Sequence, residues 1–140
     1  MTKTLHALIR LRRHQVDEKR RELAALYGEA ARLEAKREAL QDELAREQDA
    51  AAGEALLGFT YAAYGTRTIQ RRKALQREVA ALEGRIEQAQ VRVADAFRDA
   101  KSLEQVQEAR DREAAQERKR LEQAELDELA AQKHARGGGF

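Results

Sequence analysis

Apolar residues in the first half of the chain recur at every seventh position, in two series offset from each other by three or four residues. The first series holds Ile9, Val16, Leu23, Ala30, Leu44 and Ala51. The second holds Leu5, Leu26, Leu33 and Leu40. Such paired series are the a and d positions of a coiled coil. The pattern predicts a helix over about residues 3–52, in which charged residues interrupt the apolar line at Arg12, Lys19, Arg37 and Glu47.

The second half has a more regular apolar line, with spacings that alternate between four and three. Its members are Leu75, Val79, Leu82, Ile86, Ala89, Val93, Ala96, Ala100 and Leu103. Beyond Leu103 the same line carries Gln107, Arg110 and Glu117, so its packing capacity falls toward the C-terminus. A second helix is therefore predicted over about residues 67–135.

Glycines separate the two predicted helices. Gly53, Gly58 and Gly65 fall within thirteen residues, and each glycine disfavours a helix interior by about 1 kcal/mol relative to alanine. We therefore predict a turn region over about residues 53–66. A flexible tail is predicted over residues 136–140, where three further glycines lie.

The charge is distributed so that the two predicted helices attract each other when they run antiparallel. Residues 1–21 hold seven Lys or Arg against two acids, whereas residues 104–129 hold nine acids against five bases. A hairpin in which residue i faces roughly residue 120 − i brings these segments together. The predicted fold is all-α: one long antiparallel two-helix coiled-coil hairpin over residues 1–140, with the second helix overhanging the first. Such a hairpin is expected to be a monomer when free.

Composition argues against several classes of function. The charged fraction is 37%, the aromatic fraction is 4%, and cysteine and proline are absent. No P-loop, CxxC or HExxH motif occurs, and the three histidines are not spaced four residues apart as a helical metal site requires. No apolar run approaches the roughly 18 residues of a membrane span. We expect a soluble, non-enzymatic protein without cofactor, metal or membrane insertion.

The basic N-terminal segment allows two interpretations. A continuous basic helix containing Arg10, Arg12 and Arg13 can follow a phosphate backbone, which would make the chain a nucleic-acid binder. The favoured interpretation is a charged face that pairs with acids of the same chain. A generic coiled-coil scaffold, in which the apolar line is a dimer interface, is a further alternative.

The midpoint of the chain holds an aromatic cluster followed by bases. The aromatic residues are Phe59, Tyr61 and Tyr64, and the first bases after them are Arg67 and Arg71. Aromatic residues beside arginine are typical of interface hot spots, although the same rings could pack over a turn. The partner-binding interpretation is slightly favoured.

Four segments stand in a distinctive order along the chain: LHALIRLRRHQVDEKRREL from Leu5, the Tyr61 and Tyr64 pair, AKSLEQVQEARDRE from Ala100, and AELDELAAQKHAR from Ala124. Together they resemble the FliJ family, the coiled-coil stalk proteins of the flagellar type III export apparatus, with injectisome stalk proteins as relatives. The resemblance implies a non-catalytic stalk that inserts into a hexameric export ATPase, contacts the cytoplasmic domain of the export gate and binds export chaperones.

The resemblance also implies where these contacts lie and where in the cell the protein works. Its gate contact would use Phe59, Tyr61, Tyr64, Arg67 and Arg71. Its ATPase contact would use Arg10, Arg12 and Arg13 together with Leu126, Asp127 and Glu128. Such a protein is cytoplasmic and lies peripherally at the cytoplasmic face of the inner membrane.

Overall fold

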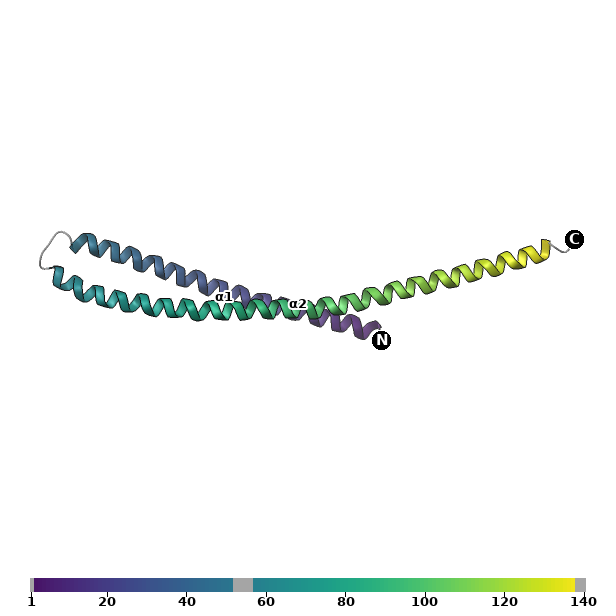
Figure 1. Ribbon diagram of the computed structural model, residues 1–140, viewed down its shortest axis with the longest axis horizontal. Helices are drawn as coiled ribbons and strands as arrows, with labels where there is room; N and C mark the ends of the chain where they lie inside the picture. Colours follow the sequence, from purple (N-terminus) through teal and green to yellow (C-terminus); the bar gives the residue numbers. More distant parts are fainter. Residues whose placement is uncertain (1, 52–56, 138–140) are drawn as a thin grey trace. The chain divides into compact units, whose positions relative to one another are not determined.

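The computed structural model describes the backbone of residues 2–51 and 57–137, and the side chains of residues 3–50 and 65–137. Two helices account for all of the described backbone: α1 (Thr2–Ala51) and α2 (Leu57–Gly137). They pack against each other as an all-α helical hairpin, which confirms the predicted fold class (Figure 1). The contacts within the chain define two compact units. The inner unit is His14–Phe97, and the terminal unit combines Met1–Arg13 with Arg98–Phe140.

In the inner unit, α1 and α2 run antiparallel and lie side by side (Figure 1). Arg85 forms an ion pair with Glu29, and Arg71 forms one with Glu43. Glu43 follows Glu29 by two heptads on α1, and its partner Arg71 precedes Arg85 by two heptads on α2. This matched spacing fixes both the antiparallel direction and the register.

The core of the inner unit follows the predicted a and d positions. Leu26, Leu82 and Ala89 are the buried residues at its centre. They are surrounded by half-buried apolar residues of both helices, namely Leu23, Ala30, Leu33 and Ile86. Because two helices cover only one face of each other, this core is a single line of side chains and the remaining faces stay in water.

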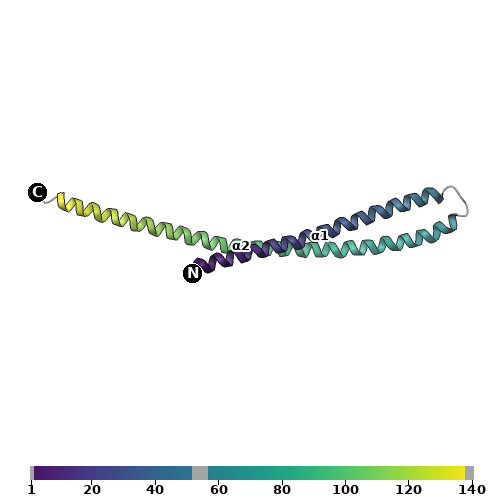
Figure 2. The ribbon, with the colours of Figure 1, turned by 180° about the vertical axis from the view of Figure 1, so that it is seen from behind.

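In the terminal unit, Leu5, Ile9 and Ala100 are buried. From Gln116 to Gly137, every described residue of α2 is exposed. The helix continues there past the start of α1 (Figure 2), which is the predicted overhang. The last turn of α2 carries His134 and Arg136, and positive charge at a helix C-terminus is favourable to the helix dipole.

The predicted start of the second helix was about ten residues too late. α2 begins at Leu57 and therefore includes Gly58 and Gly65. No described glycine has positive φ, and a Cβ built on Gly65 would meet nothing within 4 Å. A glycine costs a helix only about 1 kcal/mol, so the neighbouring helix-forming residues outweigh it. Residues 53–56 of the predicted turn lie outside the described residues, as does residue 52 at the end of the predicted first helix.

The remaining differences concern the tail and the register. α2 extends to Gly137, so the first two residues of the predicted tail are helical, and residues 138–140 lie outside the described residues. The expected register placed residue 91 opposite Glu29, whereas the observed partner is Arg85. The shift follows from the early start of α2, which moves the centre of the hairpin toward the N-terminus.

Candidate partner-binding surfaces

The basic segment of α1 in the terminal unit is paired with acids of α2. Arg13 donates a hydrogen bond from Nε to Oε1 of Glu104 at 2.8 Å. Arg12 lies 3.9 Å from Asp99, measured from Nη1 to Oδ2. The predicted pairing within the chain is therefore present, and it uses two of the three arginines that the family resemblance implies for the ATPase contact.

Arg12 occupies a d position, where a coiled coil normally buries an apolar side chain. Its side chain is 38% exposed, and its Nε atom is buried. Arg10 and Arg13 are more exposed and lie on the flank of the apolar line. The sequence thus places one of the three arginines in the helix interface and two beside it.

A groove of about 470 Å³ runs along this flank of the terminal unit. Ile9 forms an apolar part of its lining, and Arg10, Arg13, Glu104 and Glu108 supply charges of both signs. Such a mixed lining suits a protein surface of alternating charge better than a single anion.

Gln107 also lines this groove and holds an a position of α2. Its Nε2 atom donates a hydrogen bond to Oδ1 of Asp111 at 2.8 Å. Its Oε1 atom is buried and accepts no hydrogen bond within the described part of the chain. A buried acceptor without a donor weakens the packing of the helices at this level.

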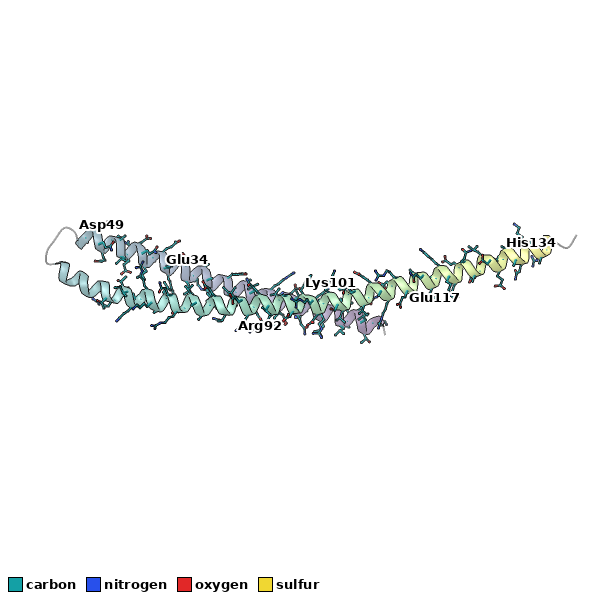
Figure 3. The ribbon with its side chains drawn as sticks, viewed as in Figure 1. Glu34, Asp49, Arg92, Lys101, Glu117 and His134 are labelled. Atoms are coloured by element: carbon teal, nitrogen blue, oxygen red, sulfur yellow. The ribbon has the colours of Figure 1, made fainter. Side chains whose placement is uncertain are left out.

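The structure places Leu126, Asp127 and Glu128 on the exposed part of α2, several turns beyond the acids that pair with Arg12 and Arg13. It does not bring the two predicted halves of the ATPase contact together. Leu126 is 60% exposed and Leu129 is 61% exposed. Figure 3 shows Glu117 and His134 projecting from α2 where no second helix lies beside it.

The exposed part of α2 contains local side-chain pairs. Asp127 accepts a hydrogen bond from Gln123 at 3.0 Å, and Arg120 donates two to Glu117, at 2.7 and 3.2 Å. The hydrogen bonds from Arg120 lower the pKa of the Glu117 carboxyl below its ordinary value. The same contact raises the pKa of the Arg120 guanidinium. Pairs three or four residues apart stabilise an isolated helix modestly.

Leu129 is as exposed as Leu126 but is not among the residues that the family resemblance implies for the ATPase contact. The two leucines are three residues apart and therefore lie on adjacent positions of one helix face. Both leucines lie off the apolar line, and a leucine there has no partner in a two-helix hairpin. This position in the sequence therefore predicts that they are exposed.

Of the residues assigned to the gate contact, Arg67 is exposed and Arg71 is partly engaged. Nη1 of Arg71 lies 3.7 Å from Oε2 of Glu43. The side chains of Phe59, Tyr61 and Tyr64 lie outside the described residues, so the aromatic part of this assignment stays a prediction.

Residues 2–51 and 57–137 provide no group of three His, Cys, Asp or Glu side chains that could hold a metal ion. Neither helix, within the same ranges, has a stretch long and apolar enough to cross a membrane. The described surfaces are therefore those of a charged helical pair with one exposed helical extension.

Comparison with known proteins identifies the family. The model of the family described as "Flagellar FliJ protein" matches residues 1–139. No curated protein and no solved structure matches the chain. Because the family match spans nearly the whole sequence, the chain belongs to the FliJ family, whose role is that of a stalk in flagellar protein export and not of a known enzyme.

Proposed function

We propose that the chain is a non-enzymatic stalk that couples a hexameric export ATPase to the cytoplasmic domain of the export gate. In this role it works in the cytoplasm, peripherally at the inner membrane, and also binds export chaperones. It is a monomer when free, because its apolar line is already covered by its own second helix.

The observation that carries the proposal is the exposed extension of α2. A helix of 22 residues from Gln116 to Gly137 has no second helix to cover it, yet it carries the exposed leucines Leu121, Leu126 and Leu129. Helical stability in proteins comes mainly from tertiary packing, so such an extension gains most when a partner surrounds it. The central opening of a hexameric ring is a partner of that kind.

The terminal unit supports the same assignment. Arg12 and Gln107 hold core positions there, and the described packing leaves one buried acceptor unsatisfied. This unit is therefore weakly packed and suited to rearrangement when a partner supplies further contacts. Arg10 is exposed on its surface and available to an acidic group of the ATPase.

The gate contact is proposed for Phe59, Tyr61 and Tyr64 with Arg67. Arg67 is exposed and lies in α2 beyond its first turn, on the same helix as the three aromatic residues. Its exposed charge is available to an acidic group of the gate.

Reciprocal variants test the two contacts in one experiment. Leu126→Ala should weaken binding to the ATPase ring and leave gate binding unchanged. Tyr61→Ala combined with Tyr64→Ala should do the opposite, so each variant serves as the control for the other. Affinities would be measured by fluorescence anisotropy of the labelled chain. Equal loss of both affinities in either variant would contradict separate contacts.

The basic-helix alternative is disfavoured by the pairing of Arg12 and Arg13 with acids of the same chain. Duplex DNA binding at low salt, with an affinity that falls steeply as salt rises, would reinstate it. A generic scaffold would instead self-associate at micromolar concentration in sedimentation, which a free monomeric stalk does not do.

A further inference from the structure

One edge of the helix pair in the inner unit carries ion pairs at heptad spacing. Arg85 reaches Glu29 at 3.4 Å, from Nη1 to Oε2, and Arg71 reaches Glu43 at 3.7 Å. All four residues hold g positions, the positions immediately before a. In an antiparallel coiled coil, g positions of the two helices face each other along one edge. We call this line of facing g positions the g edge.

The heptad between these two ion pairs has the opposite polarity. It places Lys36 on α1 and Glu78 on α2, and both side chains line the same groove as Glu29 and Arg85. In the neighbouring heptads the acid is on α1 and the base is on α2. Here the base is on α1 and the acid is on α2, so the charges are still complementary but reversed.

The heptad that precedes Glu29 on α1 and follows Arg85 on α2 again has the acid on α1 and the base on α2. Glu22 on α1 and Arg92 on α2 line one groove together with Glu29 and Arg85. Along the g edge, α1 therefore reads Glu, Glu, Lys, Glu, and α2 reads Arg, Arg, Glu, Arg in the facing order. All four facing positions are complementary, and one of the four is reversed.

The apolar core does not by itself define this register. Leu26, Leu33 and Leu40 follow one another at heptad spacing on α1. Leu82 and Ala89 do so on α2. Sliding one helix by a heptad again sets leucine against leucine or alanine, because the core repeats with the same period. The core therefore tolerates shifted hairpins.

We propose that the reversed pair, Lys36 with Glu78, fixes the register of the hairpin by excluding structures shifted by one heptad. A shift in one direction would set Lys36 against Arg85 and Glu43 against Glu78. Like charges at facing positions repel, so this register loses attractions and gains repulsions.

The shift in the other direction meets the same obstacle. It sets Lys36 against Arg71 and Glu29 against Glu78. The g edge of the native register has no like-charged pair at these four facing positions, so its discrimination comes from repulsion in the alternatives as much as from attraction in the native hairpin. Without the reversal, every shifted hairpin would keep most of its attractive pairs.

A paired substitution removes the reversal and keeps every native attraction. Lys36→Glu combined with Glu78→Lys gives a g edge in which all acids are on α1 and all bases are on α2. We expect unchanged helicity by circular dichroism, together with a mixture of registers. The substitution thus tests the choice of register while the number of attractive charge pairs in the native hairpin stays the same.

The register is read from the distance between two spin labels, using the full-length chain. The chain has no cysteine, so Gln48→Cys and Gln88→Cys provide unique attachment sites at exposed positions of the two helices. The two sites differ by roughly 30 Å along the helix axis, and a one-heptad shift changes that offset by about 10 Å. Pulsed electron paramagnetic resonance should give one distance in the parent chain and additional distances in the variant.

A matched control also swaps the charges of one facing pair, but it keeps the repulsion that excludes the shifted registers. Glu29→Arg combined with Arg85→Glu also swaps one facing pair, but like charges still meet in both shifted registers. This control should give the single distance of the parent chain. The proposal is overturned if Lys36→Glu with Glu78→Lys also gives only that distance, if both variants broaden alike, or if the first variant loses helicity. The readout uses the isolated chain, so it is independent of the proposed coupling function.

Discussion

Nε of Arg13 lies 2.8 Å from Oε1 of Glu104, and 91 residues of sequence separate the two side chains. Within the terminal unit this contact joins the first turns of α1 to the C-terminal half of α2. The contact pairs one base of the basic N-terminal segment with one acid of the acidic segment of residues 104–129. Lys101 also approaches Glu104, at 4.0 Å, so this carboxylate receives two bases.

The Arg13 and Glu104 pair should make a small measurable contribution to stability. The Arg13 side chain is 63% exposed and that of Glu104 is 25% exposed, so solvent screens the interaction. A double-mutant cycle with Arg13→Ala and Glu104→Ala should give a coupling of about 0.5 kcal/mol in chemical unfolding. Arg10→Ala in place of Arg13→Ala is the control. A coupling no larger than that of the control would contradict the contact.

Replacing Arg12 by leucine should stabilise the hairpin and impair its function. The residue holds a d position, where a half-buried charge packs less well than leucine, and its partner Asp99 remains solvated on the surface. Thermal or chemical unfolding of Arg12→Leu should show a gain of about 1 kcal/mol, together with weaker ATPase stimulation. Arg10→Leu, at an exposed position, should leave stability within about 0.5 kcal/mol. Destabilisation by Arg12→Leu would mean that the ion pair outweighs packing.

Gly84 lies in the interior of α2 with open space around it. A Cβ built there would meet nothing within 4 Å, and no described glycine has positive φ. Gly84→Ala should therefore raise the free energy of unfolding by about 1 kcal/mol, which is the difference in helix propensity. The reverse change at an exposed site of the same helix, Ala94→Gly, should lower it by a similar amount. A destabilising Gly84→Ala would show that the glycine meets a requirement of the fold.

The pair of Glu117 and Arg120 predicts a pH dependence of the exposed helix. The folded pKa of the Glu117 carboxyl is lowered, chiefly by the hydrogen bonds from Arg120. The stabilisation is therefore present above the unfolded pKa and is lost as pH falls through the folded pKa. Arg120→Gln should raise the pKa of Glu117 in a carboxyl NMR titration, whereas Arg118→Gln should not. An unchanged midpoint in Arg120→Gln would contradict the contact.

The helix pair itself could be predicted from the sequence, because its signal is periodic and long. The apolar line from Leu75 to Leu103 is buried or half-buried throughout, as its four and three spacing predicts. Arg110 and Glu117 continue the line but are exposed. Glu117 lies beyond the start of α1, whereas Arg110 is still level with the first turns of α1. The charge asymmetry of the two ends favoured the antiparallel arrangement, and Arg13 with Glu104 confirms it.

Local signals were less informative where several weak preferences compete. Gly58 and Gly65 predicted a break, yet α2 includes both, since propensity is a weak determinant next to neighbouring helix formers. Thr68 extends the apolar line one heptad before Leu75 and is only 1% exposed. Because threonine carries a hydroxyl, the pattern of apolar residues does not include Thr68, although its heptad spacing from Leu75 predicts a core position.

The residues named for the ATPase and gate contacts stay predictions, and the sequence alone could not place them relative to one another. The charge count indicated a basic N-terminal segment, but it could not show that Arg12 is half-buried while Arg10 is exposed. Nor could it show that Leu126 is separated from these arginines by several turns of α2. Such distinctions depend on the register, which the apolar line leaves open and the charged g edge determines.

Stimulation of a cognate, ring-forming export ATPase by the purified chain tests the central claim most directly. The full chain would be compared with a chain ending at Gln123, which lacks Leu126 and the rest of the exposed extension. The stalk account predicts stimulation by the full chain and its loss on truncation. An active ATPase ring that the full chain does not stimulate, or that both chains stimulate equally, would contradict it.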